Sequence, residues 1–388
     1  MDSQTVSLVR TTFKAVAAVD DGPERLTRSF YSILFTDYPE ARDFFPAAME
    51  TQRDRLVRAL AYVVDRLEDA DTLLPYLAQL GRDHRKYGTQ DAHYTAVGNS
   101  LIKALRNFAG AEMWTDDVDR AWNVALGVVA SAMTGAANAD TAPAVWGGTV
   151  IETKQVLRNL AVIKLKLNEP MPYTPGQYMS VQIPSRPRMW RYMSPATPAS
   201  DDLTVEFHVR GVTGGWVSPS MVSHTQVGEE WLLGAPLGSL GVPANPARDM
   251  LLIGCGTGIA PLRAQVLAMA EWTTSRRVHM FVGGHHPCDL YDLGMLWDLS
   301  MQNPWLTVTA VTENTHNPWW HVAEDYEAVS PGMGTLMTGQ IGRVVASLGD
   351  WADRDIQIAG APSMIQTTKF RLMAGGTPVE NIRHDPLY

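Results

Sequence analysis

The sequence predicts a multidomain protein, in which an all-α domain is followed by an antiparallel β-barrel and by an α/β domain with a parallel sheet. Three observations support this fold class. The 388 residues exceed what one hydrophobic core usually organises. Helical periodicity dominates up to about residue 137, whereas strands punctuated by Gly and Pro follow Pro143. Beyond Pro243, short buried strands alternate with helices, which is typical of a parallel sheet.

The overall composition indicates a folded protein that does not bind nucleic acid. Hydrophobic residues make up 45% of the chain and charged residues 19%, and 32 basic against 41 acidic residues give a net charge of -9. Because phosphate backbones repel a negative chain that has no basic patch, we expect no nucleic-acid partner. Only Cys255 and Cys288 are present and no apolar leader opens the sequence, so we expect a reducing, cytoplasmic location.

The first domain, residues 1–137, is predicted to be a helical bundle. Apolar residues recur at helical spacing in two stripes, Leu26, Phe30, Ile33 and Leu34, and then Leu56, Leu60, Val63, Val64 and Leu67. The segment Ala121–Ala139 carries no charge, but Asn, Ser, Thr and Gly interrupt it, so we expect a buried terminal helix rather than a membrane span. The small and polar residues over 138–146 predict a short linker.

Strand patterns define the two domains that follow the linker. An antiparallel barrel is predicted over residues 147–242 from four strand-like runs, Thr149–Thr153, Leu160–Leu167, Tyr178–Ile183 and Leu203–Val209. An α/β domain is predicted over residues 243–388 from strands at Met250–Ile253, Val278–Val282, Leu306–Val311 and Ile356–Ala359, with a helix at Ala260–Ala270.

Two side chains of the helical domain are predicted to point into its apolar interior. His84 continues the face formed by Leu77 and Leu80, seven and four residues before it. Tyr31 lies in an otherwise apolar run, and a buried phenol needs a hydrogen-bond partner. Taken alone, His84 is better explained as a core histidine bonded to a carbonyl than as a metal ligand. The surrounding motifs change that balance.

Five motifs follow one another in this domain: Phe30-Tyr31, Tyr38-Pro-Glu-Ala-Arg-Asp-Phe-Phe45, Asp83-His84, His93-Tyr94-Thr-Ala-Val-Gly and Ala121-Trp122. The ordered set resembles the globin domain of flavohaemoglobins along its whole length. The resemblance implies that haem b is a cofactor and that His84 is the proximal ligand of its iron. It also implies the roles of five further residues: Tyr31 as distal hydrogen-bond donor to bound oxygen, Phe45 packed on the porphyrin, Leu56 and Leu60 as the distal wall, and Tyr94 as the proximal-side tyrosine. Tyr31 and Tyr94 are therefore the candidate catalytic residues.

Two positions depart from this family pattern. Leu56 is the best match to a distal glutamine of the family, because a one-residue insertion shifts the alignment, so Tyr31 is expected to be the only distal donor. A family glutamate that pairs with the proximal histidine and tyrosine is absent, since the last helix reads Thr134-Gly-Ala-Ala137. A carboxylate partner raises the basicity of a ligating histidine. Its loss predicts a more neutral imidazole and a higher haem potential.

The second domain contains Pro175-Gly-Gln-Tyr178, Arg191-Tyr-Met-Ser194 and Gly214-Gly-Trp-Val-Ser218. Arg191 offers a forked cation for a pyrophosphate, and Ser218 before Pro219 predicts a helix N-cap that faces a phosphate. The three motifs resemble the flavin barrel of the ferredoxin-reductase family. The resemblance implies FAD binding by Tyr178, Arg191, Tyr192, Met193, Ser194, Gly214, Gly215, Val217 and Ser218. Met193 replaces the family's aromatic residue, and Tyr192 is displaced by one position, which places it on the opposite face of the strand.

A glycine-rich turn opens the third domain. The apolar run Leu251-Leu-Ile precedes Gly254, Gly256 and Gly258, and glycines let the backbone approach a diphosphate. With Gly283-Gly-His-His286 and Ala359-Gly-Ala-Pro-Ser-Met364, this turn resembles the nicotinamide lobe of the same family. The resemblance implies NADH or NADPH binding by Gly254, Gly256, Thr257, Gly258 and Pro261. In the tail, Leu387 and Tyr388 are candidates for flavin contact, with Tyr388 either covering the flavin face or ending in disorder.

The resemblance covers nearly the whole chain and implies a diverged flavohaemoglobin. Electrons are expected to pass as hydride from NAD(P)H to FAD and then singly to haem, where nitric oxide and O2 give nitrate. Two alternatives stay open. A flavohaem dehydrogenase with an organic donor such as a hydroxy acid is favoured by Met193 and the missing glutamate, whereas a haem-based oxygen or redox sensor is disfavoured because no signalling module is appended. The expected partners are small molecules, with no integral membrane association, and the sequence does not predict the oligomeric state.

Overall fold

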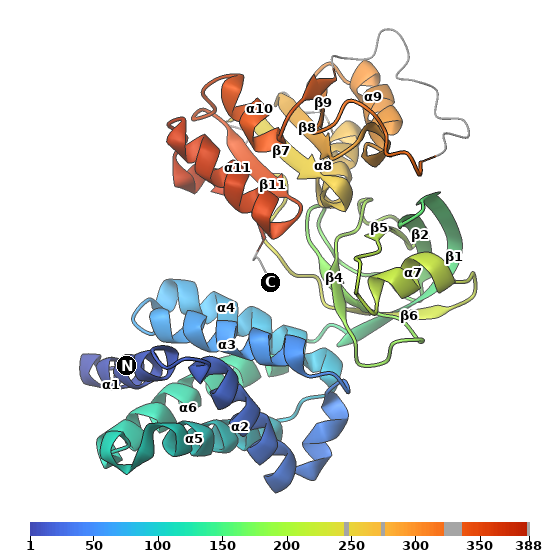
Figure 1. Ribbon diagram of the computed structural model, residues 1–388. Helices are drawn as coiled ribbons and strands as arrows, with labels where there is room; N and C mark the ends of the chain where they lie inside the picture. Colours follow the sequence, from blue (N-terminus) through green and yellow to red (C-terminus); the bar gives the residue numbers. More distant parts are fainter. Residues whose placement is uncertain (244–247, 273–275, 322–335, 386–388) are drawn as a thin grey trace. The chain divides into compact units, whose positions relative to one another are not determined.

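The computed structural model describes residues 1–243, 248–272, 276–321 and 336–385, and the chain divides into two compact units. The first unit comprises Met1–Val145 with Pro187–Met189, and the second comprises Trp146–Arg186 with Trp190–Tyr388. Helices alone build the first unit, whereas the second contains two six-stranded sheets (Figure 1). The predicted succession of a helical domain, an antiparallel barrel and a parallel-sheet domain is confirmed.

The first unit is a bundle of six α-helices with two short 3-10 helices: α1 Ser3–Ala17, α2 Gly22–Asp37, η1 Pro39–Phe44, α3 Glu50–Asp65, α4 Ala70–His84, η2 Arg85–Tyr87, α5 Asp91–Met113 and α6 Asp116–Ala139. Helix α6 contains the whole uncharged segment, but it is buried on one face only, since Val124 and Val128 are exposed. No helix in the described part of the chain is long and apolar enough to cross a membrane. Because α6 continues to Ala139 and β1 begins at Val145, the connection between them is shorter than the predicted linker.

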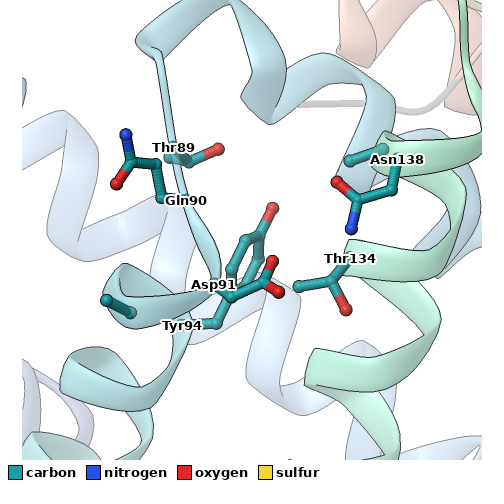
Figure 2. Close-up of a pocket in the computed structure, with 8 residues that line it drawn as sticks. Thr89, Gln90, Asp91, Tyr94, Thr134 and Asn138 are labelled. Atoms are coloured by element: carbon teal, nitrogen blue, oxygen red, sulfur yellow. The ribbon is translucent and has the colours of Figure 1, made fainter.

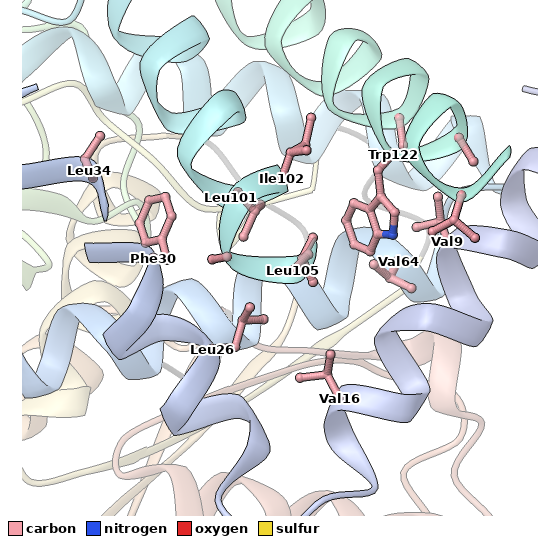
Figure 3. Close-up of a cluster of buried hydrophobic side chains, with 14 of the residues drawn as sticks. Val9, Val16, Leu26, Phe30, Leu34, Val64, Leu101, Ile102, Leu105 and Trp122 are labelled. Carbon is pink, nitrogen blue, oxygen red and sulfur yellow. The ribbon is translucent and has the colours of Figure 1, made fainter. Parts of the chain in front are cut away.

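The bundle closes around apolar residues contributed by α2, α5 and α6. Figure 3 shows Leu26 and Phe30 of α2 next to Leu101 and Leu105 of α5, with Trp122 of α6 beside them. These five side chains are at most 2% exposed. Of the first predicted stripe, Leu26, Phe30 and Leu34 are core as expected, whereas Ile33 is only partly buried. The second stripe differs, because only Val64 and Leu67 of it are buried while its other members, Leu56, Leu60 and Val63, are only partly buried.

The first sheet is the predicted antiparallel barrel, built from β1 Val145–Leu157, β2 Leu160–Leu167, β3 Met179–Gln182, β4 Arg191–Met193, β5 Thr204–Arg210 and β6 Glu230–Gly234. Its strand order is β4-β3-β6-β1-β2-β5, and helix α7, Ser218–His224, follows β5. An antiparallel bridge between Pro195 and Phe207 joins the segment after β4 to β5 and so nearly closes the sheet. Along β5, Val205, Phe207 and Val209 are buried in the barrel, which leaves the alternate side chains on the outer face.

The second sheet is parallel and consists of β7 Met250–Cys255, β8 Val278–Gly284, β9 Leu306–Thr312, β10 Met337–Thr338, β11 Asp355–Ala359 and β12 Ile382–Arg383. Its order is β10-β9-β8-β7-β11-β12. Helices α8 Ile259–Glu271 and α9 Leu293–Gln302 cover one face, and α10 Ile341–Ser347 and α11 Pro362–Ala374 cover the other (Figure 1). Short 3-10 helices are η3 Gly256–Gly258, η4 Pro287–Asp289 and η5 Val379–Asn381.

Two glutamines form a closed pair inside this domain. Gln265 of α8 and Gln357 of β11 are both fully buried, and each donates a side-chain hydrogen bond to the other, at 2.9 and 3.0 Å. The remaining amide hydrogens reach the main-chain carbonyls of Pro261 and Gly241. Burying an amide is costly unless its hydrogen bonds are made, and here they are made by the partner amide and by two carbonyls.

Candidate functional site

Tyr31 of α2 is buried among aromatic rings close to the start of α3. Its ring packs edge-on against Phe45, with centroids 5.4 Å apart, and its hydroxyl donates a long hydrogen bond of 3.5 Å to the main-chain carbonyl of Gln52. Burial raises the pKa of Tyr31 far above its usual value, and Arg53 offsets this only in part. The phenol therefore stays protonated at neutral pH and is a hydrogen-bond donor that is only weakly engaged.

Helix α3 presents apolar residues that the polypeptide covers incompletely. Leu56, Leu60 and Val63 contact the core of the bundle, yet each remains partly exposed. An apolar helix face that faces a domain interior is normally buried, because exposing it loses roughly 25 cal/mol for each Å². The half-covered face of α3, next to the Tyr31 and Phe45 rings, fits a flat apolar group such as a porphyrin.

Gln52 is a polar candidate that the sequence did not single out. It lies one helical turn before Leu56, and its carbonyl is the acceptor of the Tyr31 hydroxyl. Residues four apart share a helix face, so Gln52 belongs to the same surface of α3 as Leu56. The sequence feature that could have identified Gln52 is the run Thr51-Gln-Arg-Asp-Arg-Leu56, in which Gln52 is the one amide side chain.

His84 ends α4 with its imidazole held in a defined tautomer. Its Nδ1 atom lies 2.7 Å from the carbonyl oxygen of Leu80, and because a carbonyl can only accept, Nδ1 carries the proton. Burial lowers the pKa of His84, although Asp83 acts in the opposite direction. The ring is therefore neutral and its Nε2 atom offers a lone pair, which is the donor that a haem iron requires.

A buried ion pair lies next to this histidine. The Lys86 ammonium is 2.6 Å from the Asp83 carboxylate, and both side chains are at least nine-tenths buried. The two groups act in opposite directions on the pKa of His84, Asp83 raising it and Lys86 lowering it. The pair therefore places charge beside His84 without adding a net charge there, and the ring proton of His84 has a main-chain carbonyl as its partner.

A polar cavity of about 430 Å³ lies beside Tyr94, between the start of α5 and the end of α6 (Figure 2). Its walls are Thr89, Gln90, Asp91, Ala92, Tyr94, Thr134, Ala137 and Asn138. The Tyr94 hydroxyl is buried without a well-formed hydrogen bond in the described part of the chain, and burial raises its pKa. The Tyr94 ring centroid is 6.4 Å from that of His84. Ala137, in the stretch Thr134–Ala137 where the expected glutamate is missing, thus lines a hollow beside Tyr94.

In the barrel, β3 and β4 pair in a regular register that sorts the predicted flavin-binding residues by face. Met179 pairs with Met193, Ser180 with Tyr192 and Val181 with Arg191, and no bulge interrupts the three pairs. Arg191 and Met193 therefore share one face of β4, and both are half-buried. A cation and an apolar side chain on the same face fit contact with a single flavin nucleotide. Tyr192 lies on the other face, where its ring packs edge-on against Tyr178 at 5.1 Å.

The loop before α7 corrects one prediction. Ser218 is the first residue of α7, so Val217 and not Ser218 is the N-cap, and no side chain among the described residues caps the helix. The Ser218 hydroxyl instead accepts a hydrogen bond of 3.1 Å from the Val212 N–H, and the Gly215 N–H donates to the Val212 carbonyl. The loop is thus closed by its own hydrogen bonds, and its left-handed residue is Gly214, with φ +77°.

The glycine-rich turn lies between β7 and α8, at the carboxyl end of the sheet. Its position is a topological switch point, since β8 flanks β7 on one side and β11 on the other, and such points bind nucleotides. A Cβ added to Gly258 would lie 2.5 Å from the carbonyl oxygen of Ala359, whereas Gly256, with φ +55°, borders nearly open space. The turn fits a diphosphate, because Gly258 lets it pack closely against Ala359 and Gly256 leaves its backbone accessible to a ligand.

The C-terminal segment reaches the barrel near Tyr178. The Asp385 carboxylate accepts a hydrogen bond of 3.2 Å from the Ser239 N–H, and burial raises the pKa of Asp385 to about 6. Leu387 and Tyr388, which were predicted to contact the flavin, lie outside the described residues. Thr257 and Pro261 stand where the turn passes into α8, as expected for the nicotinamide lobe.

Comparison with known proteins identifies each domain. Residues 28–133 match the globin family, residues 148–241 the oxidoreductase FAD-binding domain and residues 252–369 the oxidoreductase NAD-binding domain. A flavohemoprotein of a Burkholderia species is 24% identical over 95% of this chain and 94% of its own.

Two solved structures resemble this fold, the first over nearly the whole chain and the second over about two thirds of it. A flavohemoglobin of Malassezia yamatoensis, determined with bound FAD and haem, has a TM-score of 0.79 and is 18% identical, covering 99% of this chain and 98% of its own. The FAD/NAD-binding domain of a nitric oxide dioxygenase from Vibrio cholerae has a TM-score of 0.50 and is 17% identical, covering 63% of this chain and 98% of its own.

The protein is therefore a haem globin joined to a flavin- and nicotinamide-binding reductase, and it passes electrons from NAD(P)H through FAD to haem. The His84 donor, the half-covered face of α3, the β3–β4 register and the glycine-rich turn fit these three groups. The chain belongs to the flavohaemoglobin family.

Proposed function

We propose that this protein is a nitric oxide dioxygenase. In the overall reaction, two NO, two O2 and one NAD(P)H give two nitrate ions, NAD(P)⁺ and one proton, so that each nitrate formed takes up one electron. The family assignment supports this proposal, as does the likeness of the reductase module to that of a nitric oxide dioxygenase.

The observation that carries the proposal is the state of Tyr31. Its phenol is buried, stays protonated and is held only by a 3.5 Å hydrogen bond to Gln52. A donor of this kind can turn towards negative charge that develops on an oxygen ligand without first losing a strong bond. With a porphyrin covering them, the Phe45 ring and the apolar side chains of α3 would exclude water from the same region and so strengthen that interaction.

In the globin domain, His84 would hold the haem iron through Nε2, while Leu80 fixes the orientation of the ring through Nδ1. Phe45, Leu56 and Leu60 would contact the porphyrin. When bound, the haem supplies the iron centre at which O2 and nitric oxide react. The polypeptide would orient the haem, exclude water from it and donate a hydrogen bond from the Tyr31 hydroxyl.

In the reductase module, the glycine-rich turn would take the dinucleotide phosphates at the start of α8, where helix N–H groups point outward. Arg191 would pair with the flavin pyrophosphate, and Met193 on the same face would pack against the flavin. When bound, FAD supplies the conversion of a hydride into single electrons.

The test follows electrons from different donors in the purified holoenzyme. Under anaerobic conditions, the haem spectrum is recorded after adding NADH, NADPH or a series of short hydroxy acids. Nitric oxide consumption is then measured with O2 present. We expect rapid haem reduction by a nicotinamide and stoichiometric formation of nitrate.

Two results would contradict the proposal. Reduction only by a hydroxy acid would make the protein a flavohaem dehydrogenase, and reduction by NADH without consumption of nitric oxide would favour the sensor. The His84→Ala variant is the control, because its flavin should still be reduced while nitric oxide is no longer consumed.

A further inference from the structure

The outer face of β5 carries charged and polar side chains that the α/β domain covers. Glu206 and His208 are less than one-tenth exposed, and Arg210 follows two residues later on the same face. His208 is bonded through Nε2 to Glu206 at 3.0 Å and through Nδ1 to the Tyr291 hydroxyl at 2.8 Å. The Arg210 guanidinium lies 3.0 Å from Asp289. The barrel and the α/β domain are thus joined by a buried polar interface.

Arg263 of α8 is the centre of this interface. Its Nη1 atom donates to the main-chain carbonyl of Ala196 at 2.6 Å and lies 3.2 Å from the Glu206 carboxylate, both in the barrel. Its Nε atom lies 2.8 Å from Asp292, which belongs to the α/β domain. Only 12% of the side chain is exposed, so these contacts are shielded from solvent. One guanidinium therefore bridges an acid from each of the two domains.

The charges around Arg263 leave little freedom for the interface to rearrange. Burial raises the pKa of the Glu206 carboxyl, but the hydrogen bond from His208 and the charge of Arg263 more than offset this and lower it. Burial raises the pKa of Asp292, and Glu206 contributes to that rise. Without Arg263, two buried carboxylates would repel each other across the interface, which is costly in a low dielectric.

The two ends of the Arg263 bridge lie beside the two nucleotide sites. Arg263 follows Gly258 of the glycine-rich turn by five residues, on the helix that begins there. Ala196 follows Ser194 of the flavin motif by two residues, and its N–H donates to the Glu206 carbonyl at 2.8 Å. The segment after β4 is thereby held to β5 through its backbone and to α8 through Arg263.

We infer that Arg263 is a positioning residue for hydride transfer. It fixes the spacing between the flavin motif and the glycine-rich turn, so that the nicotinamide reaches the flavin at a reactive distance. The inference rests on the reductase activity of the chain and is independent of what the haem does with the electrons. Arginine suits this task better than lysine, because its planar guanidinium donates to the Ala196 carbonyl while its charge lies within 3.2 Å of both the Glu206 and the Asp292 carboxylates.

The experiment measures flavin reduction by NADH in anaerobic stopped-flow with the holoenzyme. Arg263→Met should lower the limiting rate by about tenfold to hundredfold, since a displacement of about 1 Å in a reacting pair costs that much. The apparent affinity for NADH should change by less than about twofold, and the deuterium isotope effect of the transferred hydride should increase, because the hydride step becomes more limiting. Arg263→Lys should fall between the parent and Arg263→Met.

The matched control is Arg354→Met. Arg354 also pairs with a carboxylate, Asp249 at 3.2 Å, but both residues lie within the α/β domain. The limiting rate of this variant should stay within about twofold of the parent, since it removes an ion pair without touching the bridge. Amide hydrogen exchange of the holoenzyme is a second readout, because peptides that contain Ala196 should exchange faster in Arg263→Met and not in the control.

Three outcomes would overturn the inference. The first is a limiting rate in Arg263→Met within about twofold of the control. The second is a loss of rate that disappears when rates are divided by the FAD content. The third is a slow variant whose isotope effect does not rise. If Arg263→Met does not fold, the same limiting rate of flavin reduction is measured in Asp292→Asn and Arg263→Lys. Unchanged rates in both variants would reject the role of Arg263.

Discussion

The globin unit and the reductase unit form their candidate sites in different ways. In the globin unit, side chains from several helices are brought together: Tyr31 from α2, Gln52 and Leu56 from α3, His84 from α4 and Tyr94 from α5. In the reductase unit, the main chain dominates, through a glycine-rich turn at a switch point and a strand register that sorts residues by face. We therefore expect the globin site to lose its function when a side-chain group is removed. We expect the reductase site to lose its function when a side-chain atom is added to a glycine.

The strongest test of the side-chain site is the removal of its metal donor. His84→Ala should abolish stable haem incorporation, because it removes the Nε2 lone pair that would hold the iron, while the flavin spectrum stays intact in the other unit. The haem and flavin contents of the purified variant are read from its absorption spectrum. His93→Gln is the control, since His93 caps α5 and a glutamine can still accept the Gln90 N–H. Normal haem content in His84→Ala would show that the donor lies elsewhere.

The corresponding test of the backbone site adds one carbon. Gly258→Ala would place a methyl group 2.5 Å from the Ala359 carbonyl oxygen, so we expect a loss of stability of about 1–3 kcal/mol and weaker NADH binding. Gly294→Ala is the control, because a Cβ there meets nothing within 4 Å. That variant should be neutral or stabilised by up to about 1 kcal/mol. Equal thermal unfolding of the two variants would mean that the turn tolerates a side chain.

A smaller effect is expected from the distal side of the globin. Tyr31→Phe should speed oxygen dissociation roughly tenfold, since a buried hydrogen bond is worth about 1–1.5 kcal/mol and more with a charged acceptor. Flash photolysis of the oxygen complex measures the rate. Tyr62→Phe is the control, because the Tyr62 ring of α3 packs at a tilt against Tyr76, with centroids 4.4 Å apart, and the change removes the same hydroxyl group. If Tyr31→Phe leaves the rate unchanged, Gln52 becomes the first candidate for the distal donor.

The face of β4 that carries Arg191 and Met193 allows a test by gain of function. Met193→Tyr should tighten FAD binding by about 0.5–1.5 kcal/mol, the usual gain of an aromatic pair over simple burial. The regular pairing of β3 with β4 keeps Tyr192 on the other face, so the new ring should not meet a second aromatic there. FAD dissociation constants are compared with those of Met301→Tyr, whose side chain is 83% exposed. Weaker binding in Met193→Tyr would mean that the ring overpacks the site.

The smallest expected effect concerns the cavity beside Tyr94. Ala137→Glu should give the Tyr94 hydroxyl an acceptor and bring a carboxylate towards the proximal side, which shifts the haem midpoint potential downward. Redox titration of the holoenzyme measures the shift. Ala139→Glu, at the exposed end of α6, carries the same charge outside the cavity and should leave the potential nearly unchanged. Equal shifts of the midpoint potential in both variants would mean that the added charge alone, and not its place in the cavity, causes the shift.

The contrast also explains what could be predicted from the sequence. The fold class and the parallel sheet followed from periodicity, and the glycine-rich turn followed from residue types that only a tight backbone needs. Gln52 was overlooked, because its importance depends on which carbonyl of α3 meets the Tyr31 hydroxyl. The N-cap of α7 was placed one residue late, because the Ser218 hydroxyl bonds to the Val212 N–H of the preceding loop and does not cap the helix. The role of Arg263 could not be predicted from the sequence, because it depends on the fold bringing Glu206 and Asp292, from two domains, next to its guanidinium.

The closed pair of Gln265 and Gln357 constrains how this sequence can change over generations. Each amide is the partner of the other, so replacing one glutamine alone would leave a buried donor and acceptor without partners. Losing both at once, in favour of two apolar residues of similar volume, would remove the penalty between the amides and leave only the bonds to the Pro261 and Gly241 carbonyls unmade. Descendants of this chain should therefore carry the two glutamines together or neither of them, so that positions 92 residues apart mutate as one.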